Sequence, residues 1–255
     1  MRQTLSNAIA LGQFKPYMQF IYNEGKQQFT GAEILSRWHH PEKGVLPPSF
    51  FLDAMFSSNV IDQFDFQVFE NICAMVEKWE KKGLPSIIFS CNFTRITISS
   101  KTFFDRFKAI YECYQFCHDR IAIEITEDAF VKDKETAYEN VMRIREAGFR
   151  IALDDMGSGY TSICDLCDYP FNIIKLDRRL TLKALEPRGK VIISGVLDLI
   201  DKMGAVGVCE GIETAEQRQA VLDCGCKVIQ GFYYSRVYSA KEAFDLFIEG
   251  KTPTV

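Results

Sequence analysis

The 255-residue chain has few histidines and no long apolar segment. Its three histidines, His39, His40 and His118, are too few for a histidine-rich dinuclear metal site. No window approaches the ~18 consecutive apolar residues of a membrane span, and the N-terminus lacks the apolar run of a signal peptide. A net charge of −4 provides no basic face for polymeric nucleic acid. A Walker-type glycine loop, a G-x-S-x-G motif and a Ser-His-Asp arrangement are also absent.

The nine cysteines are scattered and odd in number. Secreted chains usually pair their cysteines, so we expect a reducing, cytoplasmic environment. Cys164 and Cys167 form a C-x-x-C, and Cys224 and Cys226 form a C-x-C. Two such pairs can bind zinc, but we favour the more frequent role of such thiols, which is packing in the core on neighbouring helices.

Short β-branched or aromatic runs alternate with longer runs of helical periodicity, which is typical of βα units and a mainly parallel sheet. Eight runs are predicted as strands: Tyr17 to Tyr22, Phe29 to Leu35, Ile87 to Phe93, Ile121 to Ile125, Arg150 to Leu153, Ile173 to Leu176, Ala205 to Val208 and Lys227 to Ile229. Five long runs are predicted as helices: Ile61 to Lys82, Lys101 to Cys117, Lys134 to Ala147, Pro187 to Met203 and Ala215 to Cys224. Most of these helices stop at a glycine, a common C-terminal signal.

Eight strands with intervening helices favour a closed barrel, because an open sheet would leave two edge strands to protect. TIM barrels commonly have ~250 residues in one unit, so we interpret residues 1–255 as a single α/β domain. Only Asn23 to Gln28 separate the first two strands, which is hairpin length. We therefore expect a modified TIM-like (β/α)8 barrel with an antiparallel first strand, and a frayed tail at Gly250 to Val255.

Polar residues stand at the end of nearly every predicted strand. In a barrel these ends meet at one rim, where chemistry collects. Each residue alone has an ordinary explanation: Glu124 could face outward from an alternating strand, and Asp154-Asp155 could cap a loop. Together they indicate a site formed by Glu33, Arg37, Asn92, Glu124, Glu127, Asp154, Asp155, Lys175, Asp177, Glu210, Glu213 and Gln230, with the loop Met156, Gly157, Ser158 and Gly159 after Asp155.

Converging carboxylates repel one another in a partly buried site unless cations neutralise them. Oxygen ligands with an Asn amide suit Mg²⁺ or Mn²⁺ rather than Zn²⁺. The adjacent aspartates allow Asp154 to bridge two ions while Asp155 binds the second, and metals about 3.5–4 Å apart clamp in-line displacement at phosphorus. Arg37 and Lys175 supply the cations that a phosphodiester needs. The pattern predicts metal-assisted phosphoester chemistry.

These residues resemble the EAL domain family of cyclic di-GMP phosphodiesterases, over nearly the whole chain. The signature tripeptide stands here as Glu33-Ile34-Leu35. Further blocks follow in the family's order: SCNFTRI, IEITE, LDDMGSGYTS, IIKLDR, CEGIETAEQ and IQGF. One tripeptide is a weak signal, but ordered blocks that hold all the polar positions are specific.

The resemblance implies two divalent ions, Mg²⁺ or Mn²⁺, which activate water to open one phosphodiester of cyclic di-GMP and give linear pGpG. It implies the metal ligands Glu33, Asn92, Glu124, Asp154, Asp155 and Glu210. It assigns Lys175 to orienting the attacking water, and Glu210 to holding or deprotonating that water. The residues expected to contact substrate are Gln19, Leu35, Arg37, Asp177, Glu213 and Gln230. The family also implies a homodimer, coupled to the metals through Glu127 and the loop Met156, Gly157, Ser158 and Gly159.

Four positions depart from the family pattern. Ile34 replaces a small Ala, but a strand side chain between two site positions points the other way. Met156, Ser158 and Phe20 stand where Phe, Thr and Pro are usual. These departures concern the rate and regulation of catalysis more than the ability to catalyse the reaction.

Two alternatives remain open. One is a catalytically silent receptor for cyclic di-GMP or a protein partner, and the other is a barrel metalloenzyme that stabilises an enolate with Mg²⁺ and a lysine base. We favour an active phosphodiesterase, because every ligand position is filled and because Arg37 and the paired aspartates suit phosphate. EAL domains often lie behind sensory or cyclase domains, so we expect this chain to be an excised part of a longer signalling protein.

Overall fold

The computed structural model describes residues 2–126, 134–158 and 163–253. All strands in these residues join one sheet, in the order β10-β1-β9-β8-β7-β6-β5-β4-β2-β3. The strands are β1 (Phe14–Asn23), β2 (Gln28–His40), β3 (Gly44–Leu46), β4 (Ile88–Asn92), β5 (Ile121–Thr126), β6 (Arg150–Met156), β7 (Ile173–Leu176), β8 (Val206–Cys209), β9 (Val228–Gln230) and β10 (Val237–Ser239). Because β1 also pairs with β2, the sheet closes into a barrel of eight strands, to which β3 and β10 are added.

The predicted barrel with an antiparallel first strand is confirmed. β1 runs antiparallel to both β2 and β9, whereas the pairs from β2–β4 through β8–β9 are parallel. The β1–β2 hairpin places Gln19 opposite Glu33. The first strand therefore contributes a side chain beside the EIL tripeptide.

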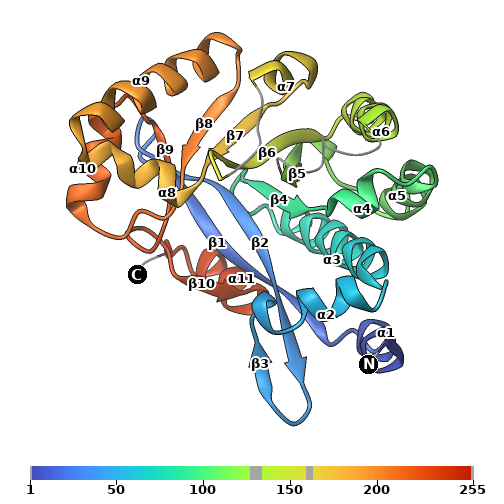
Figure 1. Cartoon of the computed structure of the whole chain (residues 1–255). Coiled ribbons are helices and arrows are strands. Elements are labelled where there is room, and N and C mark those ends of the chain that lie inside the picture. The colour runs from blue at the N-terminus through green and yellow to red at the C-terminus, as the bar shows by residue number, and fades with distance from the viewer. Residues whose placement is uncertain (1, 127–133, 159–162, 254–255) are drawn as a thin grey trace.

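Both hairpin strands are longer than predicted. They continue past the barrel as a two-stranded ribbon, to which β3 adds by pairing with β2, and Figure 1 shows the end of β2 projecting from the barrel together with β3. In the sequence, Pro16 disfavours a first strand that begins before Tyr17, because proline cannot donate a hydrogen bond to a neighbouring strand. Here Pro16 lies one residue outside the β1–β10 pairing, which begins at Tyr17.

Helices surround the barrel (Figure 1). They are α1 (Arg2–Ala10), α2 (Leu52–Ser57), α3 (Ile61–Lys81), α4 (Arg95–Ile98), α5 (Phe103–Tyr111), α6 (Lys134–Glu146), α7 (Ile163–Asp168), α8 (Arg178–Thr181), α9 (Pro187–Lys202), α10 (Ala215–Asp223) and α11 (Ala240–Ile248). The five long predicted helices are confirmed, although α5 ends at Tyr111 rather than Cys117. None of the described helices has the length and apolarity needed to cross a bilayer.

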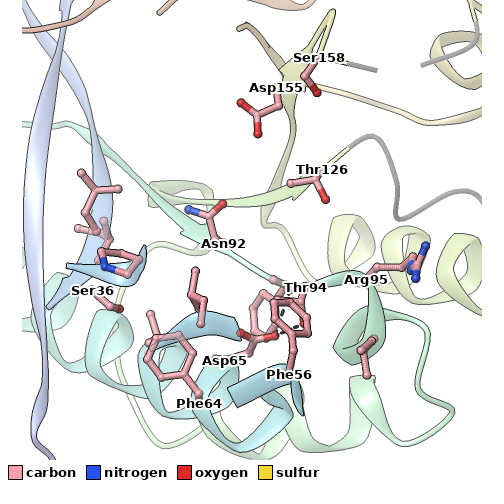
Figure 2. Close-up of a pocket in the computed structure, with 17 residues that line it drawn as sticks. Ser36, Phe56, Phe64, Asp65, Asn92, Thr94, Arg95, Thr126, Asp155 and Ser158 are labelled. Carbon is pink, nitrogen blue, oxygen red and sulfur yellow. Dashed lines mark hydrogen bonds between the residues drawn. The ribbon is translucent and has the colours of Figure 1, made fainter. Parts of the chain in front are cut away.

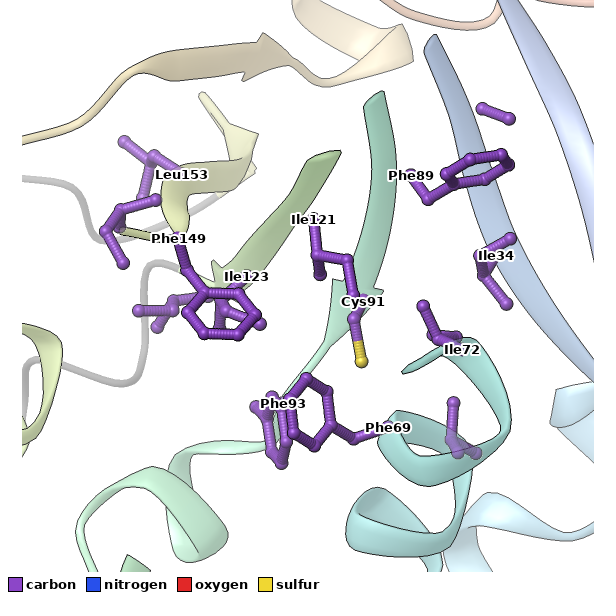
Figure 3. Close-up of a cluster of buried hydrophobic side chains, with 14 of the residues drawn as sticks. Ile34, Phe69, Ile72, Phe89, Cys91, Phe93, Ile121, Ile123, Phe149 and Leu153 are labelled. Carbon is purple, nitrogen blue, oxygen red and sulfur yellow. The ribbon is translucent and has the colours of Figure 1, made fainter. Parts of the chain in front are cut away.

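The main core lies between the strands and the helices. Figure 3 shows Ile34, Cys91 and Ile123 from three strands facing Phe69 and other apolar side chains. Ile34 is buried in this layer, which confirms that it points away from its neighbours Glu33 and Leu35.

The barrel interior is built from the alternate strand positions, because successive strand side chains point to opposite faces. A small apolar cluster of Ile21, Val208 and Val228, with Ile173 packed against it, occupies this interior. Two residues further along their strands stand Lys175, Glu210 and Gln230. An aliphatic layer therefore lies beneath a polar layer.

Candidate active site

The ammonium of Lys175 lies at the centre of the polar layer. Its Nζ is 3.3 Å from Glu33 Oε2, 3.0 Å from Glu124 Oε1, 2.8 Å from Asp154 Oδ1 and 2.8 Å from Glu210 Oε1. Lys175 and Glu124 are each 1% exposed. The ordinary alternative for Glu124, an outward-facing strand residue, is therefore wrong. Four strands place carboxylates around one buried cation.

A second group overlaps the first at Asp154. Asp154, Asp155 and Glu210 each place one oxygen within 4.8 Å of the others. The register of β6 against β7 shifts between Leu153 and Met156, and Asp155 has φ +57°. This left-handed backbone is costly for most residues, although Asp tolerates it better than most. It breaks the strand alternation, so two adjacent aspartates serve one site.

The pKa values of the cluster follow from burial and from surplus negative charge. Burial, together with the charges of Asp154 and Glu33, raises the pKa of Glu210 to about 8 although Lys175 opposes the shift. Burial and the neighbouring Asp154 raise the pKa of Asp155 to about 6. Burial alone would lower the pKa of Lys175, but the surrounding carboxylates outweigh it and raise that pKa well above its usual value. Lys175 is therefore fully protonated at neutral pH.

The donor set fits divalent cations. Five carboxylates (Glu33, Glu124, Asp154, Asp155 and Glu210) face one lysine, and when all are ionised the surplus negative charge equals the charge of two divalent ions. Glu124 Oε2 is buried and has no hydrogen-bond partner in the described part of the chain. A buried carboxylate oxygen without a partner is costly, and a cation would satisfy it.

Gln230 joins the first strand to the cluster. Its Nε2 donates to Glu33 Oε2 at 2.5 Å and lies 3.2 Å from Gln19 Oε1. Gln19 Nε2 in turn donates to the Ser235 carbonyl oxygen at 3.1 Å. Gln230 and Lys175 therefore contact the same oxygen of the Glu33 carboxylate.

Two cavities flank the cluster. One, of about 220 Å³, is lined by Gln19, Glu33, Asp177, Glu210 and Gln230 among others. The other, of about 700 Å³, is mainly apolar, and Figure 2 shows Asn92 and Asp155 near one side of it with Phe56 and Phe64 on the other. A ligand with two bulky ends could therefore span the carboxylates.

A buried aspartate supports the wall of the larger cavity. Asp65 Oδ2 accepts hydrogen bonds from Thr94 N at 3.0 Å, Thr94 Oγ1 at 2.7 Å and Thr97 Oγ1 at 2.5 Å. These contacts tie α3 to the turn after β4 that follows Asn92. Burial outweighs them and raises the pKa of Asp65 to about 6.

We expect Asp65→Asn to remove a pH dependence of stability. Because the pKa of Asp65 rises from 3.8 to about 6 on folding, its stabilising contribution is complete below pH 3.8 and is lost as the pH rises through 6. The free energy of unfolding of the parent should therefore fall by about 2 kcal/mol relative to Asp65→Asn between pH 4 and 7. Urea unfolding at several pH values measures this difference. Asp105→Asn, at an exposed ion pair with Arg143, is the matched control and should run parallel to the parent.

Comparison with known proteins agrees with this geometry. The sequence model of the EAL domain family matches residues 2–237. The chain belongs to the EAL domain family. It is 34% identical over 226 residues to the cyclic di-GMP phosphodiesterase RocR of Pseudomonas aeruginosa, and the match covers 88% of this chain and 57% of RocR. This EAL domain therefore spans little more than half of that relative.

Solved structures share the fold. The structure described as "PaMucR Phosphodiesterase, c-di-GMP complex" has a TM-score of 0.86 at 23% identity, over 94% of this chain and 98% of that one. An EAL domain protein from Listeria monocytogenes EGD-e has a TM-score of 0.84 at 23% identity, over 98% of both chains. At this level of identity the likeness establishes the architecture.

The EAL domain brings most of the predicted residues together. Glu33, Glu124, Asp154, Asp155, Lys175 and Glu210 form the cluster, Asn92 and Leu35 line the larger cavity, and Gln19, Asp177, Glu213 and Gln230 line the smaller one. Met156, Gly157 and Ser158 form the turn after Asp155. Glu127 and Gly159 lie outside the described residues.

Arg37 is placed differently from its neighbours. It lines neither cavity; its guanidinium lies 5.7 Å from the Tyr17 ring centre and donates to the Ser36 carbonyl oxygen at 3.0 Å. Sequence reasoning also missed Arg178, which pairs with Glu213 in the smaller cavity at an Nη2–Oε2 distance of 3.0 Å. The only sequence signal was its position directly after Asp177.

The expectation for the cysteines is partly wrong. Cys224 and Cys226 are buried free thiols, as expected, but Cys167 is an exposed thiol at the end of α7. The side chain of Cys164 lies outside the described residues. Among the described residues no group of three or more mutually close metal-ligand side chains contains a cysteine, which gives no support to a zinc site.

Proposed function

We propose that this chain hydrolyses cyclic di-GMP to linear pGpG. The observation that carries the proposal is a cluster of four carboxylates around one buried lysine, with Asp155 beside two of them and a cavity on each side. The phosphodiester would lie over the carboxylates, and each cavity would take one guanosine half. The names of RocR and PaMucR support the same substrate.

The proposed cofactors are two Mg²⁺ or Mn²⁺ ions. Glu33, Asn92, Glu124 and Asp154 would hold one ion, and Asp154, Asp155 and Glu210 would hold the other. Bound divalent ions polarise a phosphodiester and lower the pKa of water. The unpartnered Glu124 oxygen and the surplus negative charge support this assignment.

The chain's own residues complete the chemistry. Lys175 donates from its fully protonated ammonium, so it orients the attacking water and offsets the charge that develops on the phosphate. Glu210 accepts a proton from that water, since its carboxylate lies beside Lys175 and within 4.8 Å of Asp154 and Asp155. In the smaller cavity, Asp177 accepts from the N–H donors of a guanine edge.

Incubating the purified protein with cyclic di-GMP and Mg²⁺ or Mn²⁺ tests the proposal, with pGpG separated by chromatography. Glu33→Ala and Asp154→Ala should give no pGpG, because each removes a metal ligand. Tight cyclic di-GMP binding without pGpG from the parent protein would establish the silent-receptor alternative. Turnover of a carboxylic acid, but of no phosphodiester, would establish the enolate alternative.

We also propose that the chain forms a homodimer through α9. Val191 and Ile192 on this helix are 74% and 57% exposed, and Leu199 is exposed two turns further along. An apolar helix stripe left in water is typical of a contact surface. Gly195 between them has open space around it, which permits close approach of a second helix.

Val191→Glu should weaken the dimer about 100-fold or more, because it would bury a charge at a symmetric contact. Sedimentation equilibrium over a range of protein concentrations measures the dissociation constant. Val45→Glu, at a valine on β3 that is 51% exposed, is the matched control. A parent protein that stays monomeric, or a dimer disrupted by Val45→Glu alone, would contradict the assignment of α9.

A cytoplasmic location is proposed from the thiols. All eight cysteines with described side chains are free, as in a reducing environment. That residues 1–255 act as one domain of a longer signalling protein stays a prediction.

A further inference from the structure

The turn after β6 is held against the start of α8. Ser158 N donates to the Asp155 carbonyl oxygen at 2.9 Å, and Asp177 N donates to the Met156 carbonyl oxygen at 3.1 Å. Gly157, with φ +94°, packs so tightly that a Cβ there would lie 2.7 Å from Leu180 Cδ2. The position of the Asp155 carboxylate therefore depends on contacts between this turn and α8.

Arg179 makes two further contacts in this region through one side chain. Its Nη2 donates to the Ser158 carbonyl oxygen at 2.9 Å, and its Nε donates to Asp177 Oδ1 at 3.0 Å. A planar guanidinium can hold two acceptors in a fixed geometry, whereas the ammonium of lysine is a compact point donor. Arg179 thus bridges a carboxylate of the smaller cavity and the turn that follows Asp155.

We propose that Arg179 is a positioning residue that links nucleotide binding at Asp177 to metal binding at Asp155. This inference rests on the proposed function, because it takes Asp177 as a guanine contact and Asp155 as a metal ligand. Ordering one end of the bridge reduces the entropy lost in ordering the other end, so the two binding events strengthen each other. Arg179 itself touches neither the metal nor the reacting phosphate.

A local capping role does not need this side chain. Asp177 caps α8 by accepting from the backbone N of Arg179 at 2.9 Å, and any residue except proline at position 179 retains that hydrogen bond. The Arg179 side chain is 70% exposed, so its removal leaves no cavity in the core. Substitution at position 179 therefore separates the bridge from the cap.

The test measures metal and nucleotide binding separately. Mn²⁺ is titrated calorimetrically into nucleotide-free protein, and kcat and KM for cyclic di-GMP are measured at saturating Mn²⁺. Arg179→Ala should weaken Mn²⁺ binding and raise KM, each about tenfold, while kcat stays within about threefold. Arg179→Lys should restore the parent value of Mn²⁺ affinity or of KM, but not of both. The matched control is Lys183→Ala, which removes one positive charge at the exposed Lys183–Glu186 pair and should change neither.

Three outcomes would overturn the bridge. The first is an Arg179→Ala protein whose Mn²⁺ affinity and KM both equal those of the parent, and the second is a change in only one of these two constants. The third is full recovery of both constants by Arg179→Lys, which would show that only the positive charge matters. The Mn²⁺ titration needs no turnover. A parent protein that binds Mn²⁺ but releases no pGpG would therefore refute the proposed function, while Arg179→Ala would still test the link to the metal site.

Discussion

Replacing Glu210 by Gln should lower kcat for cyclic di-GMP by about 10²- to 10⁴-fold and leave nucleotide affinity within about threefold. Glutamine keeps the size of the side chain but cannot accept the proton of the attacking water. It also removes one negative charge beside Lys175, whose Nζ lies 2.8 Å from Glu210 Oε1. The loss should therefore fall on the chemical step rather than on binding.

Single-turnover kinetics and nucleotide titrations on the same preparation separate the two effects. Glu216→Gln, in the first turn of α10, makes the same chemical change at an exposed position and should leave kcat unchanged. A Glu210→Gln enzyme with a near-normal rate would show that another group activates the water. Retained nucleotide affinity is equally necessary, because a general loss of binding would indicate a misfolded site.

Lys175→Met should have the largest effect on stability. It leaves Glu33, Glu124, Asp154 and Glu210 around an apolar side chain in a buried space. Breaking a buried ion pair by removing one partner costs about 3–5 kcal/mol, because the remaining charge has no compensation. The free energy of unfolding in EDTA should fall by about that amount, and Mn²⁺ should recover part of it by neutralising the carboxylates.

Urea unfolding in EDTA and in Mn²⁺ provides both values. Lys190→Met is the matched control, since its exposed pair with Asp223 should contribute less than about 1 kcal/mol. Equal stability of Lys175→Met and the parent in EDTA would contradict the view that Lys175 is the main counter-charge. A large loss that Mn²⁺ does not change would contradict a metal site at these carboxylates.

Local rules predicted the parts of the fold that repeat. The alternation of strand side chains was sufficient to place Ile34 in the outer layer and Glu33 in the inner one. The six-residue connection from Asn23 to Gln28 was sufficient to predict the antiparallel hairpin. Polar strand ends were sufficient to identify the cluster, because closure of a barrel brings those ends to one rim.

The parts that could not be predicted depend on long-range packing or on single rotamers. The β1–β2 ribbon extends beyond the barrel because the two strands pair with each other and β3 pairs with β2, and no local sequence pattern predicts this pairing. Phe20, where the family pattern has Pro, is fully buried, and its ring centre lies 5.3 Å from that of Phe247. Phe247 belongs to α11, a helix that was not predicted. The pairing of Arg178 with Glu213 depends on how the start of α8 and the segment after β8 meet at the same cavity.

The aliphatic layer of Ile21, Ile173, Val208 and Val228 bears on how substrate and product reach and leave the site. These apolar side chains lie below the carboxylates, whereas the two cavities flank the polar layer itself. We therefore expect substrate and product to use these same two cavities. Under the proposed function, pGpG must leave before another cyclic dinucleotide can enter, and we expect it to compete directly with substrate.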